Sequence, residues 1–217
     1  MKFIDVSHVV EHGMVTYPGI PAPSISEYLS REASRPHYAE GTTFQIGKID
    51  MVANTGTYID APFHRYHKGK DLSELDLATL ANLSGIVFRA DPASRVINPA
   101  IFEGKELKGK AVLIHTGWDN RWRTDSYFVE HPFLTEETAR YLIASNVALV
   151  GIDSLNIDDT ENPARPVHSI LLEAGIPIVE HLCNLEALPD DGFRFFAVPV
   201  KIKGFGSFPV RAFGLVE

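Results

Sequence analysis

The sequence predicts a single α/β domain built on a mixed sheet. Two short, β-branched apolar runs, residues 111–116 and 147–153, are typical of strands that are covered on both faces. The segment between them has the pattern of a helix, which makes a β-α-β unit. At 217 residues, with 45% hydrophobic and 22% charged residues, the chain has the length and composition of one globular domain. We therefore expect one domain over residues 1–217.

An irregular N-terminal arm is expected around residues 17–42. This stretch contains four prolines among Ser, Arg and Glu: Pro18, Pro21, Pro23 and Pro36. Because proline fixes φ and lacks an N–H donor, such a stretch is poor sheet interior and suits a surface arm or lid.

The helix between the two apolar runs has signals at both of its ends. Thr135 is placed to cap its first turn, where Glu136 and Glu137 suit the helix dipole, and Asn146 can end it in the left-handed conformation. Residues 167–175 predict a second, shorter helix that ends at Gly175, followed by a strand over 176–182. The runs 193–202 and 208–216 predict a closing pair of strands.

Composition excludes several classes of function. The net charge of −8 argues against a nucleic-acid partner, because nonspecific affinity for phosphates requires clustered Lys and Arg. No signal peptide and no run of ~18 apolar residues is present, so we expect a soluble, cytoplasmic protein without a membrane partner. The single cysteine, Cys183, rules out an intramolecular disulfide and a thiolate-rich zinc site, and it is interpreted as a small buried apolar residue.

Residues 54–64 carry the most informative pattern. If this segment is extended, its polar side chains share one face, because side chains alternate with period two. These residues are Asn54, Tyr58, Asp60 and His64. Gly56 would leave room beside the backbone for an ion or a substrate, and Pro62 would turn the chain before His64. Asp60 and His64 can equally be a turn carboxylate and a surface imidazole.

A second pair of residues suits metal binding. His168 opens the short helix and Glu180 lies near the end of the strand that returns from Gly175, so both side chains can reach the same end of the unit. Together with Asp60 they would offer two carboxylates and an imidazole to a divalent cation. Alternatively, His168 caps its helix locally, and Glu180 pairs with Arg165 or Lys201.

The run N-T-G-T-Y-I-D-A-P-F-H at residues 54–64 resembles the signature H-x-G-T-H-x-D-x-P-x-H of the cyclase family, which includes bacterial kynurenine formamidases and isatin hydrolases. Further matches follow in order from about residue 3 to about residue 215, which makes the resemblance specific. They are Tyr17-Pro18-Gly19 and residues 115–119, 131–134, 150–154 and 168–180. The resemblance implies the mixed-sheet, swivelling β/β/α-like domain of that family.

The resemblance also implies a site. In the family, two of the signature's histidines and its aspartate hold one metal, and that aspartate holds a second metal with a later histidine and glutamate. Asp60, His168 and Glu180 match ligand positions, and His64 matches the catalytic histidine that transfers protons. Asn54 and Tyr58 stand where histidines are expected. Because an amide and a phenol are weaker ligands, we expect at most one divalent cation, zinc or manganese.

The resulting hypothesis is a metal-dependent hydrolase that cleaves a C–N bond in a small amide, an arylformamidase-like formamide or a lactam. A cation would lower the pKa of a water molecule from 15.7 toward ~7, His64 would transfer protons, and Tyr58 or Asn54 would stabilise the oxyanion. Tyr17 and Trp118 are assigned to the substrate pocket, although the aromatic residues after the 111–116 strand also suit ordinary packing.

Two other functions stay open. The changed ligand positions are also compatible with a metal-poor isomerase, dehydratase or lactone-acting enzyme, in which Tyr58 is a hydrogen-bond donor or acid. A non-catalytic protein that binds a small ligand is the third possibility. The resemblance further implies a homodimer or homotetramer in which the arm near Tyr17 crosses to a neighbouring subunit.

Overall fold

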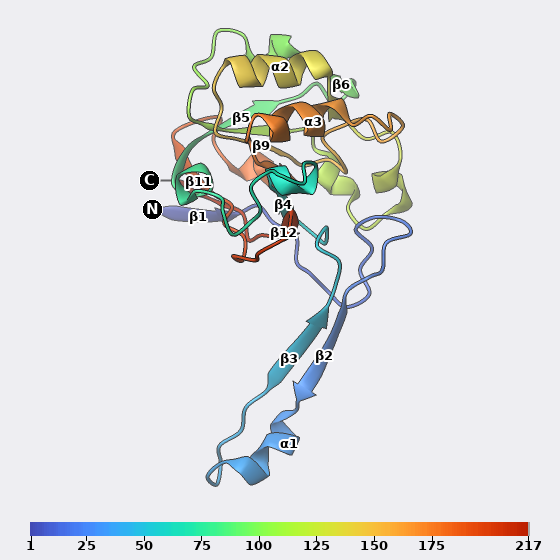
Figure 1. Cartoon of the computed structure of the whole chain (residues 1–217), viewed down its shortest axis with the longest axis vertical. Coiled ribbons are helices and arrows are strands. Elements are labelled where there is room, and N and C mark those ends of the chain that lie inside the picture. The colour runs from blue at the N-terminus through green and yellow to red at the C-terminus, as the bar shows by residue number, and fades with distance from the viewer. Residues whose placement is uncertain (217) are drawn as a thin grey trace.

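A computed structural model describes residues 1–216 of the chain (Figure 1). Within these residues the body is built on one nine-stranded sheet. In order across the sheet, the strands are β1 (Lys2–Asp5), β13 (Phe213–Val216), β11 (Phe193–Phe196), β5 (Leu83–Arg89), β7 (Ala111–His115), β9 (Leu149–Ile152), β10 (Ile178–Glu180), β4 (Tyr58–Asp60) and β12 (Ser207–Pro209). The four strands from β5 to β10 run parallel, and the flanking pairs are antiparallel. The mixed α/β sheet expected from the sequence is confirmed.

Two helices cover one face of the parallel strands, as Figure 1 shows. Helix α2 (Glu136–Ala144) connects β7 to β9, and the Thr135 hydroxyl caps it by accepting the Thr138 N–H at 3.1 Å. Asn146 follows it with φ of 55°, the left-handed conformation expected from the sequence. Helix α3 (Pro166–Glu173) lies between β9 and β10 and packs against α2. These local predictions are confirmed because caps and apolar periodicity act within a few residues.

The sheet curls so that its two edges approach each other. β12 is an edge strand and β13 lies beside the opposite edge, yet only residues 210–212 separate them in the chain. In a flat sheet, seven strand spacings would hold them about 34 Å apart, while the four Cα steps from Pro209 to Phe213 span at most about 14 Å. The two closing runs do pair, through β11 and β13, but 208–216 is not one strand, because residues 210–212 carry the chain from the edge strand β12 to β13 beside the opposite edge.

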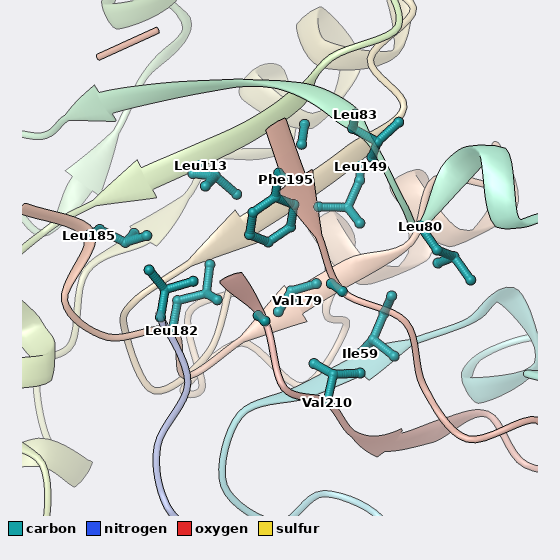
Figure 2. Close-up of a cluster of buried hydrophobic side chains, with 14 of the residues drawn as sticks. Ile59, Leu80, Leu83, Leu113, Leu149, Val179, Leu182, Leu185, Phe195 and Val210 are labelled. Carbon is teal, nitrogen blue, oxygen red and sulfur yellow. The ribbon is translucent and has the colours of Figure 1, made fainter. Parts of the chain in front are cut away.

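Each face of the sheet has its own hydrophobic core. Leu113 and Val179 point into the curl, where Ile59, Phe195 and Val210 complete the cluster shown in Figure 2. The alternate residues along β7 and β9 face the two helices instead, in a second cluster that contains Val112, Ile114, Val150, Leu142 and Leu171. This alternation with period two explains why the central strands are apolar at every position.

An arm leaves the body, as Figure 1 shows. Strands β2 (Ser24–Leu29) and β3 (Ile46–Asp50) form an antiparallel ribbon, and helix α1 (Arg31–Ser34) lies at its tip. Ser30 caps α1 by accepting the Ala33 N–H at 3.1 Å. The stretch expected to be irregular, 17–42, thus contains a strand and a helix. Its prolines stand outside both, since Pro23 precedes β2 and Pro36 follows α1.

Short elements complete the body. β6 (Val96–Ile97) and β8 (Phe133–Leu134) form a separate parallel pair. No helix in the described range 1–216 is long and apolar enough to cross a membrane. Single 3₁₀ turns occupy Arg35–His37, Pro62–His64, Leu77–Thr79, Pro99–Phe102, Trp118–Arg121, Asp125–Phe128 and Leu185–Ala187.

Candidate active site

Strand β4 and its two neighbours align four polar side chains on one face of the sheet. β10 pairs with β4 so that Glu180 stands opposite Tyr58, and β12 pairs with it so that Ser207 stands opposite Asp60. Residues directly opposite in a ladder point to the same face, and so do Tyr58 and Asp60, two positions apart. The four side chains are buried. Tyr58 and Asp60 share a face, as expected from the sequence. The carboxylates of Asp60 and Glu180 therefore lie on the same face of neighbouring strands.

His64 is held next to Asp60 by a turn. Pro62 begins a 3₁₀ turn in which the His64 N–H donates to the Ala61 carbonyl at 2.8 Å. The Ser207 hydroxyl donates its one proton to Asp60 Oδ1 and lies 2.8 Å from His64 Nδ1. The imidazole must therefore donate from Nδ1 to Ser207 Oγ, which leaves the Nε2 lone pair free to accept a proton. With 37% of its side chain exposed, His64 can exchange that proton with a bound molecule.

Asp158 positions His168. Its carboxylate accepts three hydrogen bonds, from the Val167 N–H at 2.7 Å, the His168 N–H at 2.9 Å and His168 Nδ1 at 2.7 Å. The two backbone donors belong to the first turn of α3, where N–H groups have no partner within the helix. The same carboxylate therefore caps the helix and orients the His168 imidazole. Because Nδ1 donates to Asp158, a neutral His168 presents its Nε2 lone pair to the other side.

Three of these groups converge on one point. His168 Nε2 lies 3.5 Å from Asp60 Oδ2 and 3.5 Å from Glu180 Oε1. Burial lowers the pKa of His168, but the nearby carboxylates of Glu180, Asp158 and Asp60 outweigh it and raise that pKa to about 10. Burial, together with the Asp60 charge, raises the pKa of Glu180 to about 7. Both pKa values are raised, because the pocket holds more carboxylates than positive charges.

These donors fit a divalent cation. Asp60 Oδ2 is buried and has no hydrogen-bond partner in the described part of the chain, which is costly for a carboxylate oxygen unless a ligand satisfies it. Asp60, His64 and His168 each offer one ligand atom within 4.8 Å of the others. Glu180 Oε1 adds a further oxygen next to His168. A set of carboxylate oxygens and imidazole nitrogens suits zinc or manganese.

The Tyr58 hydroxyl is a hydrogen-bond donor within the site and does not act as an acid. Its hydroxyl donates to Glu180 Oε2 at 2.5 Å and lies 3.1 Å from the Tyr17 hydroxyl. The Tyr17 hydroxyl donates to the Leu155 carbonyl at 2.6 Å and accepts from Asn156 Nδ2 at 3.1 Å. Burial and the charge of Glu180 raise the pKa of both phenols well above 10. Tyr58 therefore stays neutral and serves as a hydrogen-bond donor that positions Glu180.

A cavity of about 320 Å³ opens onto these groups. Its lining includes six residues that were singled out in the sequence: Tyr17, Asn54, Tyr58, His64, His168 and Glu180. This volume fits a small molecule. Asn54 lines the cavity, and no side-chain hydrogen bond within residues 1–216 involves it, so its amide is free to bind a ligand.

Two expectations about the pocket lining do not hold. Trp118 lies outside the pocket and is 9% exposed, with its indole N–H donating to the Tyr127 carbonyl at 2.9 Å and the Arg121 guanidinium 3.9 Å from its ring. It packs with Tyr127 and Leu155, which agrees with the packing interpretation of this aromatic loop. Gly56 leaves no opening for a ligand. It has φ of 65°, and an added Cβ would lie 3.2 Å from Val10.

A second group of possible ligands suits a cation less well. Ligand atoms of His115, Asp119 and Glu186 lie within 4.8 Å of one another. However, Arg89 Nη1, which can only donate, is 3.1 Å from His115 Nδ1. The proton of a neutral His115 is then on Nε2, 3.9 Å from Glu186 Oε2, so this nitrogen has no lone pair to offer. This group therefore lacks the imidazole nitrogen that a cation would need.

Several residues of the site were not indicated by the sequence. Asp158 lies eight positions before Pro166, the first residue of α3, which is too far for the residue that usually caps a helix, so no local pattern indicates its role. Ser207 is 147 positions away from Asp60, and Asn156 is 24 away from Glu180, to which its amide donates at 3.4 Å. Only the strand pairing brings these residues together.

A family model and relatives of similar length match this chain. The Cyclase family model, described as "Putative cyclase", matches residues 4–159. The chain is 30% identical over 213 residues to the kynurenine formamidase of Geobacillus thermodenitrificans (strain NG80-2), covering 97% of this chain and 95% of that protein. It is 26% identical over 212 residues to the kynurenine formamidase of Bacillus cereus (strain ATCC 14579), covering 97% and 96%.

Solved structures share the fold. A potential metal-dependent hydrolase with cyclase activity superposes with a TM-score of 0.80 at 27% identity, covering 100% of this chain and 98% of that one. An isatin hydrolase bound to the product analogue thioisatinate superposes with a TM-score of 0.82 at 22% identity, covering 99% and 92%. Since the family model matches well over half of the chain and its signature segment lines the pocket, the chain belongs to the cyclase family.

Proposed function

We propose that this protein is a metal-dependent hydrolase that cleaves a C–N bond in a small amide, formamide or lactam. The observation that carries the proposal is the unpartnered Asp60 Oδ2 beside His168 Nε2, at a pocket that His64 also lines. The names of the relatives, kynurenine formamidase and isatin hydrolase, support the same reaction class. Both names describe the opening of an amide or lactam bond by water.

Asp60, His168 and Glu180 would hold one divalent cation, zinc or manganese. When bound, such a cation would polarise the substrate carbonyl and lower the pKa of a nearby water molecule. Glu180 is oriented for this role by the Ile157 N–H, which donates to Oε1 at 2.7 Å, and by Tyr58 at Oε2. His64 lies near Asp60 and His168 as well, but its Nδ1 carries the proton that it donates to Ser207 and its Nε2 is the nitrogen that transfers protons, so we do not count it as a ligand.

The proton transfers fall to His64. Its Nδ1 proton is held by the Ser207–Asp60 chain, so Nε2 accepts a proton from the attacking water. The same nitrogen then returns this proton to the leaving nitrogen of the substrate. Asn54, whose amide is uncommitted, would donate to the oxygen on which negative charge develops. Tyr58 keeps its proton and fixes Glu180.

Metal analysis combined with a substrate panel tests the proposal. Protein purified without added metal should contain about one equivalent of zinc or manganese and should hydrolyse members of a panel of formamides, isatin-like lactams and lactones. Asp60→Asn and His168→Gln should each lower metal content at least tenfold. His115→Gln, in the second histidine–carboxylate group, is the matched control and should retain the metal. Full activity in protein with no stoichiometric cation would contradict the metal-dependent mechanism.

We also propose a homodimer or homotetramer. The β2–β3 ribbon carries exposed apolar side chains, including Tyr28 at 76%, Ile46 at 48% and Ile49 at 56%. A ribbon of two strands is marginally stable alone, and exposed apolar patches commonly mark interfaces. Light scattering should give a multiple of the 24.0 kDa chain mass. Tyr28→Lys with Ile49→Lys should shift the protein toward a monomer, whereas Val129→Lys, on the body, should not.

A further inference from the structure

Two arginines stand at the pocket that holds the candidate ligands. Arg65 follows the turn that places His64, and Arg165 directly precedes α3, which carries His168. Both line the cavity of about 320 Å³. Neither belongs to the signature segment or to the candidate metal site. Their position adds two positive charges at the opening of a pocket on a chain with a net charge of −8.

Each guanidinium is anchored by one of its donors to a neutral acceptor. Arg65 Nε donates to Ser169 Oγ at 3.1 Å, and Arg165 Nη1 donates to the Asp159 carbonyl at 3.0 Å. Within residues 1–216 neither arginine forms an ion pair with a carboxylate. Four other arginines do: Arg89, Arg123, Arg140 and Arg211. Since a guanidinium has five N–H donors in a planar fork, both arginines keep donors for a ligand.

The backbone of Arg165 points to a function as well. Its φ of 46° is left-handed, a conformation that L residues other than Asn and Asp rarely adopt. Strain of this kind persists where the surrounding structure requires it, and it is found most often at ligand sites. The N–H groups that begin α3 are already taken by Asp158, so an anion at this place must be bound by the side chains.

We propose that Arg65 and Arg165 bind the carboxylate of the substrate, so that the substrate is a small amide bearing a negative charge. This inference rests on the proposed hydrolase function and specifies its substrate class. A carboxylate matches the planar guanidinium fork, and the two arginines attract it to a protein whose overall charge repels anions. The amide to be cleaved then lies between this anchor and the group formed by Asp60, His64 and His168.

Two substrates of equal shape and different charge test the proposal. They are 2-formamidobenzoate, which carries a carboxylate, and 2-formamidobenzamide, which is neutral. The wild-type kcat/KM should favour the carboxylate by roughly ten- to a hundredfold, mostly through KM, because charge-assisted hydrogen bonds to guanidinium are among the strongest in proteins. Arg165→Gly should lower the ratio of the two kcat/KM values, carboxylate over neutral substrate, at least about tenfold, and Arg65→Met should lower the same ratio.

The variants separate a binding role from a structural one. Glycine adopts φ of 46° without strain, so Arg165→Gly removes the guanidinium and relaxes the backbone. Arg165→Lys should rescue part of the preference, because the charge is kept and the fork is lost. Arg123→Gly is the matched control: Arg123 also has a left-handed φ, 65°, and it does not line this cavity, so its replacement should leave the substrate preference unchanged.

A binding measurement keeps this inference independent of the proposed reaction. If neither formamide is hydrolysed, the proposed function fails for these substrates, and calorimetric titration with benzoate and benzamide still decides the inference. Benzoate binding that exceeds benzamide binding and weakens at least about tenfold in Arg165→Gly supports it. Equal binding of the two ligands, or benzoate binding that Arg65→Met and Arg165→Gly both leave unchanged, overturns it, since the anion then binds elsewhere.

Discussion

Asp158 connects the stability of α3 to the orientation of His168, and replacing it with asparagine should weaken both. The change keeps the size of the side chain and removes one acceptor oxygen and the negative charge. In the best orientation, the amide oxygen still accepts from His168 N–H and Nδ1, while the new NH₂ group faces the Val167 N–H. Two buried donors then lack an acceptor.

The magnitude follows from this count. An unsatisfied buried donor costs about 1–3 kcal/mol, so two of them predict a loss of about 2–6 kcal/mol in the free energy of unfolding. Because Asp158 also fixes the nitrogen that His168 presents to the pocket, metal affinity should fall about ten- to a hundredfold. Urea unfolding of the metal-free protein measures the first effect, and competition with a chelator measures the second.

Asp159→Asn is the matched control for Asp158→Asn. Asp159 is the next residue, and its replacement makes the same change in charge and preserves the carbonyl that binds Arg165. It should alter the free energy of unfolding by less than about 0.5 kcal/mol, as expected for a position without buried partners. If Asp158→Asn behaved like this control in both assays, the helix cap and the positioning of His168 would not depend on the carboxylate, and the reasoning would be refuted.

Three further predictions address other parts of the molecule. Burial lowers the pKa of His8 from 6.5 to about 4, so the unfolded chain binds the proton first and stability should fall by up to about 3 kcal/mol as the pH drops from 6.5 to 4. His8→Phe should remove most of that loss in urea unfolding at pH 4.5 relative to pH 7, and an unchanged pH dependence would contradict the assignment. Gly206→Ala would bring a Cβ within 2.4 Å of His64 Cα, so activity should fall at least tenfold, whereas Gly204→Asn, in open space with a left-handed φ, should be tolerated. Phe195→Ala in the curled core should lower the free energy of unfolding by about 3–5 kcal/mol, and a loss below 1 kcal/mol in urea would contradict its placement.

The parts of the fold that follow from local physics could be predicted from the sequence. The strands within 111–116 and 147–153 and the helix capped by Thr135 each depend on residues a few positions apart. The curl could not be predicted, because residues 210–212 do not differ in composition from strand residues. Their crossing between two sheet edges depends on strand pairs that are distant in sequence.

The candidate site divides in the same way. Alternation along one strand placed Tyr58 and Asp60 on one face, and the return of β10 from α3 brought Glu180 back to the end of the sheet at which His168 stands. As an acid, Tyr58 would have to give its hydroxyl proton to a bound molecule. In the structure, that hydroxyl donates its proton to Glu180. A hydrogen-bond partner of this kind cannot be recognised from the residue type.

The sequence by itself determined the kinds of groups available here, carboxylates, imidazoles, an amide and two arginines, and the local conformation of the segments that carry them. Only the tertiary structure decided that Ser207 orients His64 and that Tyr58 donates its proton to Glu180. The physical reason is the range of the forces involved. Propensities, caps and turns act over a few residues, whereas burial and strand pairing select contacts between positions more than a hundred residues apart.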